Sequence, residues 1–259
     1  MALKQLLDLT GRTALITGGS RGLGLQIAAG YGEMGARVVV SARKADELDI
    51  ACTQLRAQGI DASWIAADGS QEEDIARLAG EAVARLGHVD ILVNNAGASW
   101  GASAEDHPIE AWDKVMNLNI RGVFLLTRAI GKSCMIPRRY GRIVNIASIA
   151  GLLGNPPQLM STIAYNTSKG ALVNFTRALA SEWGQHNITV NALAPGFFPS
   201  KMTQGVISRF GAEALARFAP LLRIGDDEDL KGAALLFASE AGKHITGQIL
   251  AVDGGASVY

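Results

Sequence analysis

Short runs of consecutive apolar and β-branched residues recur along this chain, and longer segments with helical periodicity separate them. Because these runs are apolar at successive positions, they predict strands buried on both faces, as in a parallel sheet covered by helices. Strands that alternate with helices are typical of an α/β fold with a doubly wound parallel sheet. The pattern therefore predicts one α/β domain over residues 1–259, with strands at 13–17, 38–41, 62–67, 91–94, 142–146, 189–193 and 248–252.

Two local signals predict where helices begin. A glycine-rich turn follows the first strand and leads into a helix over residues 22–34. After the third strand, Ser70-Gln71-Glu72-Glu73 has the pattern of a capping box, in which Ser70 opens the next helix. The sequence shows no linker, internal repeat or low-complexity segment, which favours a single domain.

The composition fits a globular protein with a large core, since 48% of the 259 residues are hydrophobic and 19% are charged. The 24 Lys and Arg residues balance the 24 Asp and Glu residues, which argues against nucleic acid or an anionic membrane as a partner. Only two cysteines occur, Cys52 and Cys134, so neither a disulfide framework nor a metal site is expected. The sequence has no apolar run of membrane-spanning length and no signal-peptide pattern, and we expect a cytoplasmic protein.

The glycine-rich turn after the first strand carries the first chemical signal. Gly18, Gly22 and Gly24 allow a tight turn, a close approach to a pyrophosphate, and close packing of the next helix on the sheet. The helix that follows would present free backbone N–H groups to phosphates. Because the turn lies between a first strand and a first helix, it predicts dinucleotide binding, with the spacing Gly-x3-Gly-x-Gly.

Tyr165 and Lys169 carry the second signal, because residues at i and i+4 lie on one face of a helix. A phenol has a pKa of about 10, and a neighbouring ammonium favours the phenolate and lowers that pKa. The pair thus predicts a general acid/base that moves a proton on or off an alcohol oxygen. Since this spacing also occurs by chance on solvated helices, the prediction depends on the rest of the chain.

Four blocks in this order resemble the short-chain dehydrogenase/reductase family of the single-domain type: the glycine motif, Asn94-Asn95-Ala96-Gly97, Tyr165-x3-Lys169, and Pro195-Gly196. The resemblance covers residues 11–255 and is nearest to 3-oxoacyl-carrier-protein reductases and gluconate 5-dehydrogenases. It implies a Rossmann-type sheet of seven strands with NAD(H) or NADP(H) across its carboxyl edge. It also implies hydride transfer between the nicotinamide and a ketone or secondary alcohol.

The resemblance implies four catalytic residues. Tyr165 is placed like the general acid/base, and Lys169 like the residue that lowers its pKa and binds the nicotinamide ribose. Ser148 is placed like the serine that holds the substrate oxygen. Asn119 is placed like the residue that orders a proton-carrying water, with Asn117 as a nearby competitor.

The resemblance also implies the residues that bind the cofactor. Asp68 would lie at the adenine, Ser200 near the phosphates and Phe198 near the carboxamide. The full implied set is Gly18, Ser20, Arg21, Gly22, Leu23, Gly24, Arg43, Asp68, Asn95, Ala96, Gly97, Tyr165, Lys169, Pro195, Gly196, Phe198 and Ser200.

The end of the second strand predicts which cofactor is preferred. An enzyme specific for NAD usually has an acidic residue there, whereas this chain has Ala42 followed by Arg43 and Lys44. Arg43 and Arg21 suit a 2′-phosphate through charge-assisted contacts, although Arg43 and Lys44 also fit the solvated start of a helix. The sequence favours NADP(H) over NAD(H).

The substrate stays open. An extended loop at residues 154–162 makes Leu153, Leu159 and Met160 candidates either for the substrate pocket or for a subunit contact. The segment after Pro195-Gly196 resembles a lid and predicts one helix with apolar Val206, Ile207, Phe210, Leu215 and Phe218.

Several functions and partners stay possible. A 3-oxoacyl-thioester reductase would dock its carrier through arginines such as Arg138 and Arg139, but Ser181 stands where a second arginine is expected. A non-catalytic NADP(H)-binding sensor or scaffold is the other alternative. The resemblance further implies a homo-oligomer, either a tetramer or a dimer.

Overall fold

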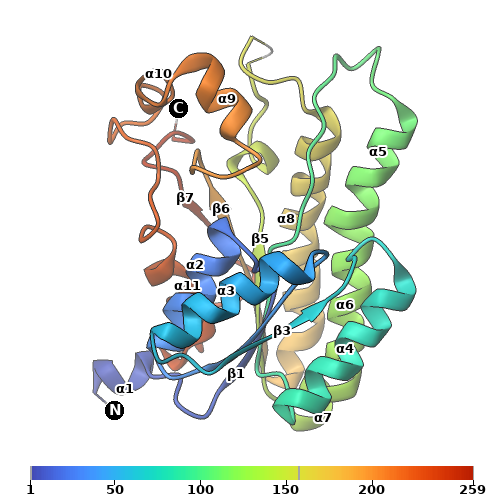
Figure 1. The fold of residues 1–259 in the computed structure, drawn as a ribbon, viewed down its shortest axis with the longest axis vertical. Coiled ribbons are helices and arrows are strands. Elements are labelled where there is room, and N and C mark those ends of the chain that lie inside the picture. Colours follow the sequence, from blue (N-terminus) through green and yellow to red (C-terminus); the bar gives the residue numbers. More distant parts are fainter. Residues whose placement is uncertain (1, 157, 259) are drawn as a thin grey trace.

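A single sheet of seven parallel strands forms the centre of the computed structural model, which describes residues 2–156 and 158–258 (Figure 1). The strand order is β3-β2-β1-β4-β5-β6-β7. The strands are β1 Thr13–Thr17, β2 Arg37–Ala42, β3 Ala62–Ala66, β4 Ile91–Asn94, β5 Gly141–Ile146, β6 Ile188–Pro195 and β7 Ile249–Val252. All seven predicted strands are present, and the prediction of a doubly wound parallel α/β sheet is confirmed.

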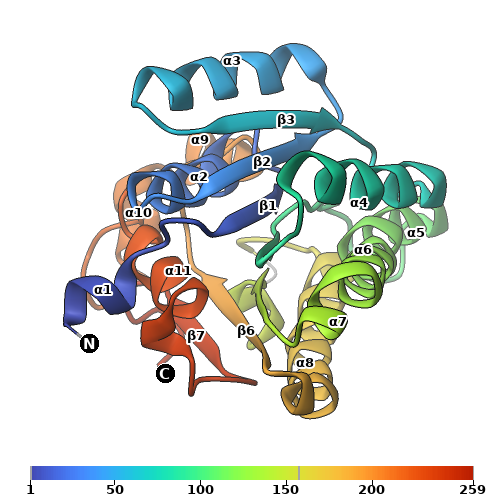
Figure 2. The same cartoon turned by 90° about the horizontal axis from the view of Figure 1, so that it is seen from below.

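Helices cover both faces of this sheet. Ile16 and Val40 pack with one apolar cluster and their neighbours Leu15 and Val39 with the other, because successive side chains of a strand point to opposite faces. Figure 2 shows the two layers, with α2 and α11 on one side and α4, α6 and α8 on the other. The helices between the strands and around the sheet are α2 Gly22–Glu33, α3 Ala45–Ala57, α4 Glu72–Leu86, α5 Ile109–Met116, α6 Val123–Ile130, α7 Ile136–Arg138, α8 Ile163–Trp183 and α11 Lys231–Ala238.

The remaining short helices lie at the start of the chain and after β6, and they are α1 Leu3–Leu7, α9 Gln204–Phe210 and α10 Ala212–Ala216. The prediction of one helix after β6 is wrong, because Gly211 adopts φ +80° and separates α9 from α10. None of the helices in the described part of the chain has the length and apolar character needed to cross a membrane.

The start of α4 differs from the capping-box prediction. The helix begins at Glu72, with Gln71 at its N-cap position. The Ser70 hydroxyl instead donates a hydrogen bond to Oδ1 of Asp68 at 2.7 Å, and Asp74 accepts the Asp68 N–H at 2.8 Å. The predicted Ser70 box is therefore wrong, because the turn around Asp68 uses the hydroxyl that would cap the helix.

The order of the strands determines where a ligand can bind. The connections run outward in opposite directions from β1 and β4, which pair with each other at the centre of the sheet. A crevice opens beyond the carboxyl ends of the strands at such a switch point. The segments that follow β1, β4 and β5 meet there, and these segments carry many of the predicted functional residues.

A close contact between two turns supports this edge. A Cβ added to Gly122, in the π-helical turn Asn117–Gly122 between α5 and α6, would overlap the carbonyl oxygen of Gly69.

We expect Gly122→Ala to lower the free energy of unfolding by about 1–3 kcal/mol, because the two turns must move apart to admit the added methyl group. Thermal unfolding measures this loss. Gly80→Ala is the control, since Gly80 lies in α4 with nothing within 4 Å of an added Cβ, and it should raise stability slightly.

Candidate active site

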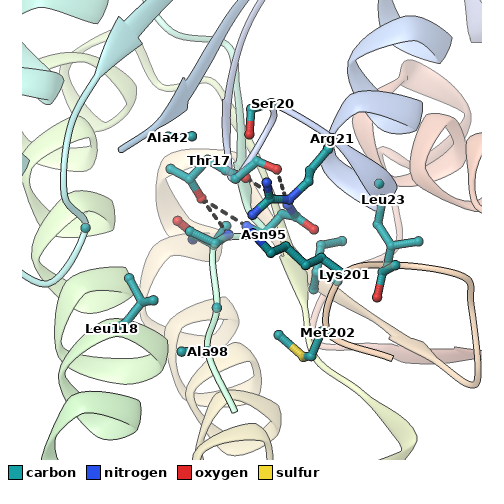
Figure 3. A pocket seen from close by; sticks show the side chains of 18 of the residues that line it. Thr17, Ser20, Arg21, Leu23, Ala42, Asn95, Ala98, Leu118, Lys201 and Met202 are labelled. Carbon is teal, nitrogen blue, oxygen red and sulfur yellow. Dashed lines mark hydrogen bonds between the residues drawn. The ribbon is translucent and has the colours of Figure 1, made fainter. Parts of the chain in front are cut away.

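A cleft of about 750 Å³ lies at the carboxyl edge of the sheet, between the segments that follow β1, β2, β4, β5 and β6 (Figure 3). It collects almost all the predicted residues, from Gly18 in the glycine turn to Ser200 in the segment after β6. Gly24 and Asn119 are the two predicted residues outside its lining, and both lie behind its walls. The structure thus brings together residues that are far apart in the sequence.

The glycine turn is held against the start of the segment after β4. The side-chain amide of Asn95 donates to the carbonyl oxygens of Thr17 and Gly18 at 2.9 and 3.0 Å. The Thr17 hydroxyl accepts the backbone N–H groups of Asn95 and Ala96 at 3.0 and 3.1 Å. A Cβ at Gly24 would overlap the Gly18 carbonyl, so α2 approaches the turn as closely as the motif predicts. Asn95 therefore shapes the cleft through the backbone it holds.

The first turn of α2 presents its N-terminus to the cleft. The helix begins at Gly22, and its first backbone N–H groups have no partner within the helix itself. A Cβ added to Gly22 would lie 3.9 Å from Cβ of Ser200, so the segment after β6 forms the facing wall. Figure 3 shows Lys201 from that wall beside Arg21. Lys201 was not among the predicted residues, and only its position next to Ser200 could have indicated it.

The end of the cleft beside β2 is rich in charge. Nη1 of Arg21 donates to Glu47 at 2.6 Å, and Nζ of Lys44 lies 3.1 Å from the other Glu47 oxygen. The hydrogen bond from Lys44 is the main cause that lowers the pKa of the Glu47 carboxyl. Arg43 lines the same end and makes no ion pair with any residue in the described ranges. The sequence prediction missed Glu47, although its position three residues after Lys44 places the two on one helix face.

Tyr165, Lys169 and Ser148 meet at the other end of the cleft. Tyr165 and Lys169 are on α8, and Ser148 follows β5 at the start of a short 3-10 turn. Nζ of Lys169 donates to the carbonyl oxygen of Ile146 at 2.6 Å and lies 5.5 Å from the centre of the Tyr165 ring. The ammonium is therefore held between the end of β5 and the phenol.

The pKa values at this end differ from the prediction. Burial raises the pKa of the Tyr165 phenol, and the hydrogen bond with Ser148 opposes this in part. Burial also lowers the pKa of Lys169 to about 8. Among the protein's own groups the pKa of Tyr165 is thus not brought below its ordinary value, because loss of hydration outweighs what favours the phenolate. The predicted lowering is wrong for the protein alone.

Asn119 lies in the π-helical turn and is completely buried, whereas Asn117 is exposed. Its amide donates to the Ala98 carbonyl and to the Ser168 hydroxyl, both at 2.9 Å, and its oxygen accepts the Ala98 N–H at 2.8 Å. A Cβ at Gly97 would lie 3.4 Å from Oδ1 of Asn119 and 3.8 Å from Nζ of Lys169. Asn119 and Lys169 therefore border the same glycine, and single π turns are frequent at functional positions.

The apolar residues of the loop after β5 that were candidates for the substrate pocket do not line the cleft. Ala98, Ser99 and Met202 line the cleft, whereas Leu153, Leu159 and Met160 are absent from its lining among the described residues. Leu153 is exposed, and Leu159 and Met160 are half-buried. Residue 157 of the predicted loop lies outside the described residues. Phe198 lines the cleft but is largely buried, packed on Gly225.

Comparison with known proteins shows which family the chain is similar to. Residues 12–209 match the family described as short chain dehydrogenase. The chain is 37% identical over 259 residues to gluconate 5-dehydrogenase of Gluconobacter oxydans, with 100% of this chain and 99% of that protein covered. It is 43% identical over 258 residues to the rhamnolipids biosynthesis 3-oxoacyl-[acyl-carrier-protein] reductase of Pseudomonas aeruginosa, with 96% and 97% covered. A gluconate 5-dehydrogenase from Burkholderia cenocepacia, solved with NADP and tartrate, superimposes with a TM-score of 0.93 at 32% identity, over 100% of both chains.

The lowered pKa of Lys169 can be observed directly. In protein labelled with 13C at the lysine Cε positions, we expect one resonance to titrate with a midpoint near a pKa of about 8. Lys231 is the internal contrast, because hydrogen bonds to Glu33 and Glu228 raise its pKa against the effect of partial burial. Lys169→Arg should remove the early titration. If no lysine resonance moves between pH 7 and 9, Lys169 is more hydrated than its burial indicates.

Proposed function

The chain belongs to the short-chain dehydrogenase family, and on that basis we propose that it is an NADP(H)-dependent oxidoreductase acting on a ketone or secondary alcohol. The observation that carries this proposal is the cleft itself, with a phosphate-binding turn at one end and Ser148, Tyr165 and Lys169 at the other. We further propose that the chain forms one domain over residues 1–259 and works in the cytoplasm.

The residues of the cleft fit a dinucleotide. Gly18 and Gly22 adopt φ +64° and +54°, a backbone conformation that favours glycine. Because glycine has no side chain, the backbone there is open to the approach of a pyrophosphate. The N-terminus of α2 and Lys201 offer positive charge on both sides of that position. A volume of about 750 Å³ is in the range of cofactor pockets. Bound NADP(H) supplies or accepts the hydride.

The protein's own residues then control the proton. During reduction, Tyr165 donates a proton to the substrate oxygen, and Ser148 donates a hydrogen bond that stabilises the charge developing there. Lys169 has a pKa of about 8, so near neutral pH it carries a proton that it can release to the phenolate. Asn119 closes the relay, because it holds the Gly97–Ala98 backbone beside Lys169. Oxidation uses the same groups in the reverse order.

The preference for NADP(H) rests on Arg43 and Arg21 at the end of β2. A 2′-phosphate there would accept charge-assisted hydrogen bonds from Arg43, whose guanidinium is exposed in the cleft. Ala42 provides no carboxylate for the ribose hydroxyls of NAD. Glu47 is already occupied by Arg21 and Lys44, so it is poorly placed to take that role.

Exposed apolar side chains support a homo-oligomer, either a tetramer or a dimer. Phe124 on α6 is exposed and packs edge-to-face on Phe175 of α8, and Leu250 on β7 is exposed on a separate surface. Carrier docking through Arg138 is not supported. Arg138 donates to the buried Asp90 at 2.9 Å, and α7 precedes β5 at the end of the sheet opposite the cleft (Figure 1).

Tyr165→Phe tests the catalytic proposal against a sensor or scaffold. We expect kcat to fall at least about 100-fold, because the proton donor is lost, while the Kd for NADPH stays within about threefold. Tyr31→Phe is the matched control, since it removes a buried hydroxyl outside the cleft, and it should leave kcat unchanged. Stopped-flow NADPH oxidation and fluorescence titration measure both quantities. Full activity of the Tyr165→Phe variant would refute the assigned role.

Arg43→Ala tests the cofactor preference. We expect the Kd for NADPH to rise about 10- to 100-fold through loss of charge-assisted contacts, and the Kd for NADH to change less than about threefold. Arg85→Ala on α4 removes an exposed charge that pairs with Glu81, and it should affect neither cofactor. Equal weakening of both cofactors by Arg43→Ala would contradict the proposed 2′-phosphate contact.

A further inference from the structure

A network of buried hydrogen bonds joins the centre of the sheet to the helix that carries Tyr165 and Lys169, and we call it the buried amide network: Asn94, Thr127, Asn145 and Thr176. The Asn94 amide on β4 donates to Oδ1 of Asn145 on β5 at 2.8 Å and to the hydroxyl of Thr127 on α6 at 3.0 Å. The Asn145 amide donates in turn to the hydroxyl of Thr176 on α8 at 2.9 Å. Two adjacent strands are thereby bonded to two helices on one face of the sheet (Figure 2).

Apolar side chains surround this network. Asn145 and Thr176 are 0% exposed. Leu92 and Ile143, two residues earlier on each strand and therefore on the same face, belong to the apolar core. An apolar pair of similar shape would fill this space with equal or better stability. A hydrogen bond adds direction, because it weakens steeply when its length or angle changes. The network is therefore suited to fixing positions rather than to adding stability.

Thr176 lies on the same side of α8 as the catalytic pair. Tyr165, Lys169 and Thr176 are at positions i, i+4 and i+11, which return to one side of a helix over about three turns. Nζ of Lys169 donates to the carbonyl oxygen of Ile146 at 2.6 Å, and Ile146 directly follows Asn145 on β5. Two consecutive residues of β5 therefore hold α8, through side chains about two helical turns apart.

The two bonds from α8 to β5 differ in kind. In the proposed reaction Lys169 releases and regains a proton, so its bond to Ile146 changes strength during turnover. The bond between Asn145 and Thr176 joins uncharged groups, and the Thr176 hydroxyl is also fixed, because it donates to the Leu172 carbonyl at 2.8 Å. This second bond can keep α8 in place while Lys169 changes its charge.

The surroundings of Lys169 make its pKa a measure of that position. Lys169 faces the Ile146 carbonyl from β5, Gly97 and Asn119 from the segments after β4 and α5, and the Tyr165 ring on its own helix. Tyr165 is the one titratable group among these four, and burial alone lowers the pKa of Lys169 to about 8. Water that enters between α8 and β5 would raise this pKa toward its ordinary value.

We propose that Asn145 and Thr176 are positioning residues, whose hydrogen bond sets the distance between α8 and β5 and so places Tyr165 and Lys169 opposite Ser148. This inference rests on the proposed oxidoreductase function and adds two residues that are absent from the cleft lining among the described residues. Both act through the side chains of α8.

The first experiment compares Thr176→Val, which removes the hydroxyl at nearly constant shape, with Thr176→Ser, which keeps it. NADPH oxidation by the full-length protein is measured with 5-ketogluconate and with a 3-oxoacyl N-acetylcysteamine thioester. We expect Thr176→Val to lower kcat about 10- to 100-fold, because the reacting groups are misplaced. KM and the Kd for NADPH should change less than about threefold, since Thr176 is remote from the glycine turn. Thr176→Ser should restore kcat to within about threefold of the original protein.

The second experiment follows Lys169 itself, in protein labelled with 13C at the lysine Cε positions and without cofactor. In Thr176→Val the midpoint of the Lys169 titration should rise from about 8 toward the ordinary lysine value, and in Thr176→Ser it should stay at about 8. The alkaline loss of kcat for reduction should move to higher pH in Thr176→Val, because reduction needs the proton that Lys169 carries.

Two further variants separate position from stability. Thr127→Val removes an equally buried partner of Asn94, but on α6, which carries none of the four proposed relay residues. It should lower the Tm about as much as Thr176→Val and leave kcat and the Lys169 titration unchanged. The double variant Asn145→Leu/Thr176→Val removes both partners of the bond, so that neither is left unpaired, and it should remain folded with a low kcat.

Each outcome decides one proposal. Full kcat in the double variant, or an unchanged Lys169 midpoint in Thr176→Val, would overturn the positioning role. An equal loss of kcat in Thr127→Val, or a failure of Thr176→Ser to restore it, would overturn it as well. Absence of turnover in the original protein would count against the proposed function, while the lysine titration would still test the positioning role.

Discussion

The hydrogen bonds between Asn95 and the glycine turn are the interaction on which the rest of the active site depends. They join the loop after β4 to the loop after β1 at the point where the sheet changes direction. Asn119 then fixes the next residues of the same loop through Ala98, and Lys169 lies on the other side of Gly97. A single chain of contacts therefore connects the glycine turn to Lys169. The two ends of the cleft keep their relative positions because they share this scaffold.

Loss of hydration on burial is the main cause of the pKa shifts of Lys169 and Tyr165. Lowering the pKa of Lys169 from 10.5 to about 8 corresponds to about 3 kcal/mol of lost preference for the ammonium. The same loss of hydration raises the pKa of Tyr165. The phenol is thus a weak acid among the protein's own groups, and Ser148 is the neighbour that favours its ionised form.

The sheet can be predicted from the sequence because its strands are continuous apolar runs, and each of the seven runs forms a strand. The predicted close packing of the next helix on the glycine turn is also present, because a Cβ at Gly24 would overlap the carbonyl oxygen of Gly18. The prediction failed at Ser70, whose hydroxyl had two possible partners and bonds to Asp68 rather than to the helix. It also missed the Arg21–Glu47 ion pair and the position of Lys201 beside Arg21, because both depend on contacts between segments that are distant in the sequence. Local patterns specify elements, whereas these contacts arise only when the elements are packed.

Relatives with over 30% identity carry names as different as gluconate dehydrogenase and 3-oxoacyl reductase. A proton relay acting on one oxygen does not recognise what is attached to the carbon beside it, so Tyr165 and Ser148 cannot explain that range. Beside Ser148, the segments after β4, β5 and β6 also supply cleft-lining side chains outside the relay, among them Ser99 and Met202. In the segment after β5, the side chains of Asn155, Thr162 and Asn166 hydrogen-bond to one another.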